Sequence, residues 1–245
     1  MTPSLADITL SFEQSVIFLK NLSSQHELKI EIIPGKSRCI VFDQQDVKIF
    51  DFRFPLCFPG FKAGQTLTGY TRSLPISIPP YIILLIRAGQ SALGYFQNGI
   101  LQQHKVIRKY MVRKKQGKAQ LSFQKQKHSS SLGARIRMAN TVSFFEEINA
   151  KLQEWFESNP GEKIIYSCTP LLWSALFRSK IHPPFDKRDE RLIRIPLHIP
   201  TPDFKTLRYI NHFSLSGLCH FYNSSQVENM IGSLDDEKNL TLKDD

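Results

Sequence analysis

One segment in the middle of the chain combines a glycine, a glutamine and many positive charges. Gly117 is followed three residues later by Gln120. A glutamine amide does not titrate, so Gln120 cannot act as a general base, but it can both donate and accept hydrogen bonds and so orient a water or a hydroxyl. The glycine lets backbone approach a bound molecule closely. Basic residues on both sides are candidates for binding phosphates, namely Arg113, Lys114, Lys115, Lys118, Lys125 and Lys127.

The positive charge of the chain is concentrated around this segment. The formal net charge is +10 and the sequence pI is about 9.5. From Phe52 to Phe145 there is no Asp or Glu, although this span carries 15 of the 32 Lys and Arg residues. Like charges repel unless a partner of opposite sign relieves them, so this segregation favours a polyanion, and nucleic acid is the commonest one. A basic surface without a specific role is the alternative.

Other kinds of site find little support in the sequence. The histidines show no metal-ligand spacing, so no metal is expected. No apolar run reaches about 18 residues and no signal-peptide pattern opens the chain, which predicts a cytoplasmic protein without a membrane partner. The four cysteines lie far apart and predict buried thiols rather than a disulfide framework or a zinc site: Cys39, Cys57, Cys168 and Cys219.

The elements that must position Gly117 and Gln120 are strands on one side and a long helix on the other. Asn98-Gly99 is a strong hairpin signal, and residues 113–131 are predicted to form a loop. Three strands are predicted before the loop, Tyr81–Arg87, Ser91–Gln97 and Ile100–Val112. A helix is predicted after it, from about Leu132 to Phe156, with an apolar stripe of Ile136, Val142, Phe145, Ile148, Leu152 and Trp155.

Helices and strands alternate after this helix. A strand over Lys163–Ser167, a helix over Pro170–Phe177 and a strand over Leu192–Ile195 are predicted, followed by a last helix from about Asp203 into the 220s. Together these elements predict an α/β fold with a mixed central sheet and helices on both faces.

The chain is predicted to divide into three parts. Residues 1–79 form a small N-terminal α+β extension with a helix, short strands and an irregular connection over 56–80. Residues 80–231 form the main α/β domain. Residues 232–245 form an acidic, disordered tail.

The stretch from His104 to Gln120 resembles the strand and catalytic loop of the Vms-like release factor family. Members of that family are similar to the central domain of eukaryotic and archaeal class I release factors, with G-x-x-Q in place of Gly-Gly-Gln. The resemblance covers about residues 80–222. The segments that carry it elsewhere are Ile82–Arg87, Ser91–Gln97, Ser131–Arg137 with Asn140, Ile195-Pro196 and Pro202–Arg208. With no ankyrin repeats or C-x-x-C zinc finger, the chain looks like a stand-alone member of the bacterial type.

The resemblance implies a ribosome-associated enzyme. Its partners would be the large ribosomal subunit and peptidyl-tRNA, with no cofactor and no DNA. Gln120 and Gly117 would be catalytic in freeing the nascent chain from a stalled ribosome. Cleavage of the tRNA backbone near its CCA end, and non-catalytic binding of rRNA or tRNA by a basic module, are the alternatives.

The start of the long helix would add RNA contacts through Arg135, Arg137 and Asn140. A helix N-terminus attracts anions, so a phosphate there would ease the placement of two arginines at the positive end of the helix dipole. Simple exposure of the arginines is the alternative. This sequence departs from the pattern of the family at Met138, Ala139, Thr141 and Thr201.

Overall fold

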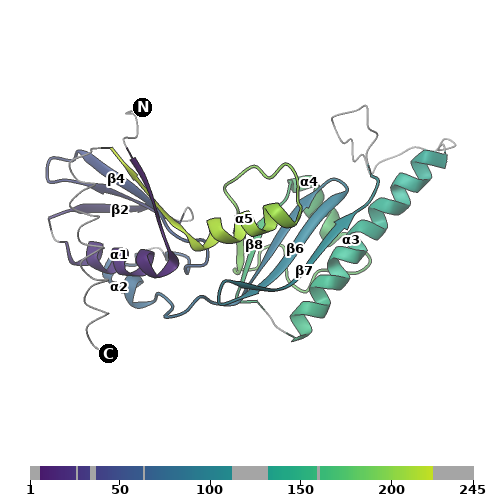
Figure 1. The fold of residues 1–245 in the computed structure, drawn as a ribbon, viewed down its shortest axis with the longest axis horizontal. Coiled ribbons are helices and arrows are strands. Elements are labelled where there is room, and N and C mark those ends of the chain that lie inside the picture. The colour runs from purple at the N-terminus through teal and green to yellow at the C-terminus, as the bar shows by residue number, and fades with distance from the viewer. Residues whose placement is uncertain are drawn as a thin grey trace. The chain divides into compact units, whose positions relative to one another are not determined.

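The computed structural model describes residues 6–25, 27–33, 37–62, 64–111, 132–158 and 161–222. The chain divides into two compact units (Figure 1). The first contains residues 1–78 together with residues 212–245, and the second contains residues 79–211. Each unit is built around its own five-stranded sheet.

The sheet of the first unit is antiparallel throughout and has the order β1-β10-β4-β3-β2. Its last strand along the chain, β10, lies between β1 and β4, where Cys219 pairs with Ile8 on one side and with Phe52 on the other. The strands are β1 (Ala6–Leu10), β2 (Lys29–Ile33), β3 (Arg38–Phe42), β4 (Lys48–Arg53) and β10 (Gly217–Phe221).

Helix α1 (Phe12–Ser24) packs against this sheet, and the short helix α2 (Leu67–Arg72) lies beside α1. α1 begins with a capping box, in which the Ser11 hydroxyl accepts from the Gln14 backbone and the Gln14 side chain accepts from the Ser11 backbone. The Phe18 ring contacts the rings of Phe50 and Phe52 on β4. Asp51, which lies between these two phenylalanines, therefore points to the opposite face of the sheet.

The sheet of the second unit is mixed, with the order β7-β6-β5-β8-β9. β5, β6 and β7 form an antiparallel meander, whereas β8 pairs in parallel with both β5 and β9. Asn98 and Gly99 both have positive φ, which confirms the predicted hairpin between β6 and β7. The strands are β5 (Tyr81–Arg87), β6 (Gln90–Gln97), β7 (Ile100–Arg108), β8 (Lys163–Ser167) and β9 (Leu192–Arg194).

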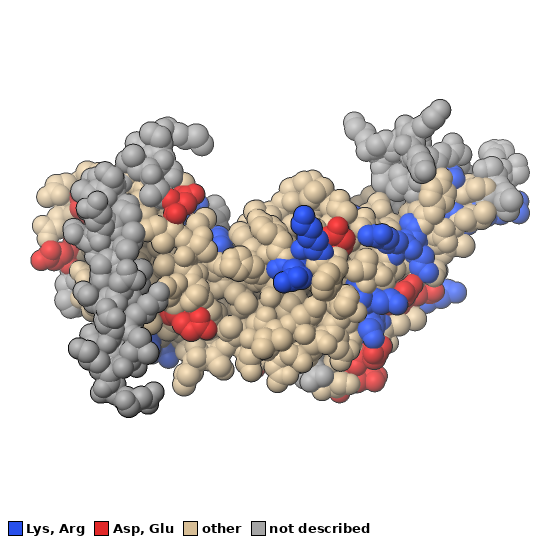
Figure 2. All heavy atoms as spheres, viewed as in Figure 1, with Lys and Arg blue, Asp and Glu red and all other residues tan. Residues whose placement is uncertain are grey.

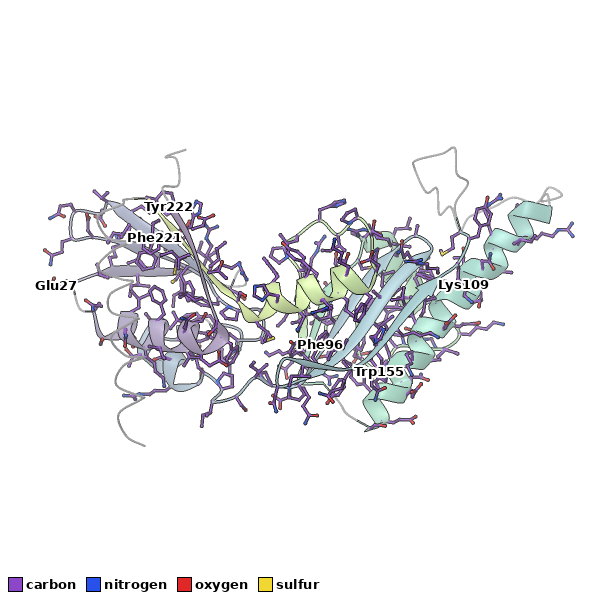
Figure 3. The ribbon with its side chains drawn as sticks, in the orientation of Figure 1. Glu27, Phe96, Lys109, Trp155, Phe221 and Tyr222 are labelled. Carbon is purple, nitrogen blue, oxygen red and sulfur yellow. The ribbon has the colours of Figure 1, made fainter. Side chains whose placement is uncertain are left out.

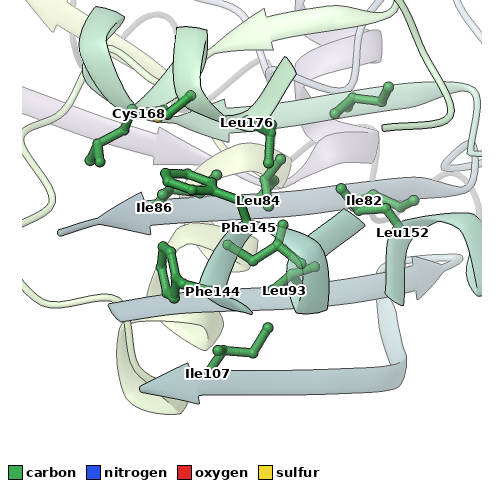
Figure 4. Packing of buried hydrophobic residues seen from close by; sticks show 14 of the residues in the cluster. Ile82, Leu84, Ile86, Leu93, Ile107, Phe144, Phe145, Leu152, Cys168 and Leu176 are labelled. Carbon is green, nitrogen blue, oxygen red and sulfur yellow. The ribbon is translucent and has the colours of Figure 1, made fainter. Parts of the chain in front are cut away.

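Helices cover both faces of this mixed sheet, as predicted. Alternate residues of β5 point to opposite faces, and Ile82, Leu84 and Ile86 join the core formed with α3 (Leu132–Ser158) and α4 (Pro170–Phe177) (Figure 4). Tyr81 points to the other face, where its hydroxyl donates to Asn211 in α5 (Phe204–Leu215). Trp155 is buried near the C-terminal end of α3 (Figure 3).

The structure differs from the sequence-based expectations at several elements. β7 ends at Arg108 rather than Val112, and neither β1 nor α2 was predicted. The expectation that the last helix continues into the 220s is wrong, because α5 ends at Leu215 and residues 217–221 form β10. Burial alternates along β10, but its apolar residues directly follow a helical stripe and look like its continuation. Residues from 212 onward therefore belong to the first unit, whereas the predicted main domain extended to 231. The predicted tail, 232–245, lies outside the described residues.

Candidate functional site

Most of the predicted site residues lie outside the part of the chain that the structure describes. These are Gly117, Gln120, Arg113, Lys114, Lys115, Lys118, Lys125 and Lys127, all within residues 112–131. The structure does describe the two ends between which this segment runs. It begins after Met111, three residues beyond the end of β7, and is followed by Leu132, the first residue of α3. We call residues 112–131 the basic segment.

The first end of the basic segment is fixed to the turn between β5 and β6. The Lys109 backbone amide donates to the Gly89 carbonyl at 2.9 Å, and Met111 is buried in the core of the unit. Gly89 has φ of +77°, and a Cβ added there would overlap the Lys109 carbonyl oxygen. Only glycine allows the turn to lie this close to residues 109–111.

Asn140 connects α3 to the residues that precede the basic segment. Its Nδ2 donates to the Tyr110 carbonyl at 3.0 Å, so an α3 side chain satisfies a backbone acceptor just beyond β7. The predicted RNA-binding residue therefore has a structural contact, and RNA binding by Asn140 stays a prediction. The next residue, Thr141, is buried, and its hydroxyl donates to the Arg137 carbonyl at 2.8 Å.

Two ion pairs add to this connection between β7 and α3. Glu147 lies 3.5 Å from the Nζ of Lys105 and 3.0 Å from the Nζ of Lys109, and Figure 3 shows Lys109 beside the helix. All three side chains are partly exposed, so each pair contributes at most about 1 kcal/mol. The two ion pairs matter more for the local charge, because Glu147 neutralises part of the positive charge on this side of β7.

The first turns of α3 extend past the hydrophobic core. Arg135 is exposed and Arg137 is half-buried, and neither forms an ion pair within 4 Å with any residue that the structure describes. The predicted apolar stripe is correct from Phe145 onward and wrong before it, because Ile136 and Val142 are 47% and 42% exposed. Arg135 is therefore available to a partner and Arg137 partly so, while Thr141, where the sequence departs from the family pattern, packs inward.

A second basic surface lies on the other side of β7. A shallow hollow of about 500 Å³ is lined by Val106, Arg108, Asp203, Phe204 and Lys205. It is not predictable from the sequence, because no pattern in either segment indicates that the end of β7 lies beside the start of α5. On the face shown in Figure 2, Lys and Arg side chains gather over α5, β7 and α3.

The cysteines and the possible metal ligands were the other candidates for a reactive site. The four cysteines are buried, as predicted, and burial raises the pKa of the Cys168 thiol to about 12, which disfavours a thiolate nucleophile. Within the described ranges, His, Cys, Asp and Glu side chains form no group of three or more that could hold a metal ion. No helix in that part of the chain is long and apolar enough to span a membrane.

The fold and the site thus define a mixed α/β domain that holds a cationic segment between an edge strand and a long helix. Residues 81–216 match the family described as Bacteroidetes VLRF1 release factor, and the chain belongs to this family. The match covers more than half of the chain and includes the whole basic segment, and it confirms the family predicted from the sequence.

Curated relatives agree with this assignment. The tRNA endonuclease ANKZF1 of Mus musculus is 29% identical over 135 residues, which are 54% of this chain and 18% of that protein. The Homo sapiens protein of the same name is 29% identical over 134 residues, with the same shares. The match therefore spans less than a fifth of the length of these relatives. Among solved structures, the Vms1 mitochondrial localization core has a TM-score of 0.48 at 12% identity, covering 81% of this chain and 92% of that chain.

Proposed function

We propose that this protein frees nascent chains from peptidyl-tRNA on stalled ribosomes, through hydrolysis of the ester that joins peptide and tRNA. The observation that carries this proposal is that the family match includes Gly117 and Gln120, in a segment that follows residues held by Gly89 and Asn140. A rigid base suits a segment that must present one side chain to a substrate.

In the proposed reaction, the Gln120 amide orients a water toward the ester carbonyl. The water oxygen bonds to the carbonyl carbon, the bond from that carbon to the ribose oxygen breaks, and the ribose oxygen takes up a proton. Because Gln120 cannot accept that proton at neutral pH, the neighbouring hydroxyl of the terminal ribose assists its transfer. The products are a free peptide carboxylate and an intact tRNA.

The basic residues have a positioning role in this proposal. Arg113, Lys114, Lys115, Lys118, Lys125 and Lys127 neutralise phosphates as the segment enters the RNA-lined peptidyl-transferase centre of the large subunit, and Arg135 and Arg137 extend the contact along α3. Such contacts add affinity without reading sequence. The site of action is then the cytoplasm, where the ribosomes are.

A second candidate reaction is cleavage of the tRNA backbone near its CCA end. The names of the relatives, which are tRNA endonucleases, favour it. In that reaction the same cations would stabilise the negative charge that develops on the attacked phosphate. The two reactions leave different tRNA ends and can be separated by one measurement.

The test is to replace Gln120 with alanine and to incubate the protein with stalled large subunits that carry peptidyl-tRNA. Loss of one oriented hydrogen-bonding group should lower the release rate on the order of 100-fold. Gln124→Ala is the matched control, because it removes the same side chain from the same segment outside the G-x-x-Q motif.

Sequencing the 3′ end of the released tRNA completes the experiment. An intact CCA end supports ester hydrolysis, and a shortened end supports the endonuclease. Unchanged release by Gln120→Ala would contradict a catalytic role of Gln120. If the unaltered protein releases no peptide, non-catalytic RNA binding is the remaining hypothesis.

A further inference from the structure

The edge strand β7 presents different side chains to its two sides. Ile107 packs in the core with α3, and Lys105 and Lys109 pair with Glu147 on that helix. The alternate residues His104, Val106 and Arg108 point to the opposite side, toward the start of α5. The hollow described above lies on this side, which is separate from the side that holds α3.

One exposed aromatic ring, that of Phe204, lines the hollow. Phe204 in the first turn of α5 is 40% exposed, and its ring centroid lies 4.7 Å from that of His104. Tyr209, on the same helix but outside the lining of the hollow, is 59% exposed. The exposed face of an aromatic ring is in contact with water, and a planar partner that stacks on it would remove this apolar surface from water.

Unpaired cations surround these rings. Arg108, Lys205 and Arg208 are exposed, and none of them lies within 4 Å of a carboxylate in the residues that the structure describes. This distinguishes them from Lys105 and Lys109 across the strand, which share Glu147. Arg208 lies four residues after Phe204, so the two side chains share one side of α5.

The acid that lines the hollow is already used by the protein. Asp203 accepts from the Thr206 backbone amide at 2.7 Å and caps α5. Hydrogen bonding to Thr206, with the nearby charges of Arg108 and Lys205, holds the pKa of Asp203 below its ordinary value. The charge available to a ligand is therefore positive.

We infer that the hollow between β7 and α5 binds single-stranded RNA, and that its ligand is the unpaired 3′ end of the tRNA. An exposed aromatic ring beside two cations suits an unpaired nucleotide, because a base can stack on the ring while phosphates contact the cations. An acidic peptide would use the cations but not the ring, and a paired duplex does not offer its base faces for stacking.

The position of the hollow agrees with this ligand. Arg108, the last residue of β7, precedes Met111 by three residues, which corresponds to about 10 Å of extended chain, and the basic segment begins after Met111. An RNA end held beside Arg108 is thus brought to the base of the segment that carries Gln120. The identity of the RNA as a tRNA end rests on the proposed function, whereas the binding of single-stranded RNA does not.

The test measures binding of the intact chain to a short 5′-labelled RNA that ends in CCA, by fluorescence anisotropy. Phe204→Ala should weaken binding about 5- to 100-fold through loss of base stacking, and Phe204→Tyr should keep it. Arg108→Gln and Lys205→Gln should each reduce the slope of log affinity against log salt by about 0.7. Lys180→Gln, which changes an exposed lysine after α4, is the matched control.

The outcomes separate this inference from the proposed function. Equal affinities for the unaltered chain and for the Phe204 and Arg108 variants would overturn the inference, and so would equally effective competition by a blunt RNA duplex. Gln120→Ala should leave the affinity unchanged. If it abolishes peptide release while the hollow variants bind normally, the proposed function stands and the hollow has no part in it. Melting curves of each variant show whether lost binding reflects lost folding.

Discussion

At the scale of single residues, Asp51 is the most constrained carboxylate of the first unit. It is buried, and it accepts from the Tyr222 hydroxyl at 2.7 Å and from Lys48 at 3.1 Å while Arg38 pairs with it. Burial by itself raises the pKa of Asp51, but the hydrogen bonds from Tyr222, Lys48 and Arg38 outweigh it and hold the pKa below its ordinary value of 3.8. The carboxylate therefore stays charged inside the unit.

This lowered pKa predicts a specific loss of stability in acid. Because the pKa of Asp51 is lower in the folded than in the unfolded state, its contribution is complete above about pH 4 and is lost as the pH falls further. Asp51→Asn should cost about 1–3 kcal/mol at pH 7, less than a fully buried pair, because Arg38 and Lys48 are partly exposed. The cost should shrink toward pH 3.

Urea unfolding followed by far-UV circular dichroism at both pH values checks this prediction. Tryptophan fluorescence would follow unfolding of the second unit and not of the unit that contains Asp51, because both tryptophans, Trp155 and Trp173, lie in the second unit. A difference between Asp51→Asn and the unaltered protein that stays the same at pH 7 and pH 3 would contradict the assignment.

The position of Asn140 could be predicted from the sequence, but its hydrogen-bond partner could not. Its position near the start of a helix after a basic loop is visible in the sequence, and so is its resemblance to a family motif. That its amide reaches the Tyr110 carbonyl is not visible, because the two residues come together only when β7 and α3 pack. The same holds for Glu147, whose two lysine partners lie on another element.

At the scale of elements, the turn between β5 and β6 controls the strand end that leads to the basic segment. Gly89 is the residue through which it acts, since its positive φ and its lack of a side chain both permit the contact with Lys109. A change in this turn should therefore alter the backbone position of residues 109–111, although they lie about 20 residues further along the chain.

Gly89→Ala should displace this strand end. The new Cβ overlaps the Lys109 carbonyl oxygen and the backbone is strained, so a loss of about 1–3 kcal/mol is expected. The Lys109 amide, which donates to Gly89, should exchange its hydrogen faster. Gly64→Ala is a matched control, because Gly64 has a similar φ of +76° but open space around it. Equal exchange at Lys109 in the two variants would contradict this role of the turn.

Elements with a strong local signal were predictable, and elements defined by distant partners were not. The apolar run of β5, the Asn98-Gly99 turn and the proline at the start of α4 each determine their element locally, and α4 has the predicted bounds. The hollow beside β7 forms only because Val106 and Arg108 on one element lie near Phe204 on another. Periodicity carries no information about such a pairing.

At the scale of the whole molecule, the first unit is assembled from both ends of the described chain. β10 separates β1 from β4, so residues 1–78 alone contain only part of a sheet. Gly217 fits against Ser15 and Phe52, where a side chain would overlap both. The predicted N-terminal extension, residues 1–79, does not include this strand, whose five residues closely follow a helix in the sequence.

A fragment of residues 1–78 should therefore fail to fold on its own. β1 loses its pairing partner, and β4 loses one of two, which leaves unpaired strand edges. Joining residues 212–222 to this fragment through a flexible linker should restore a dispersed amide NMR spectrum. A folded 1–78 fragment would show that β10 is dispensable.

The placement of β10 also fixes an order of events during synthesis. A ribosome makes residues 1–78 early, but their sheet cannot close until residues 217–221 have emerged, after the entire second unit. Until then β1 and β4 are available to strands of other chains. Slow translation through the second unit should thus increase aggregation of this protein, and moving the β10 sequence ahead of residue 6 should reduce it.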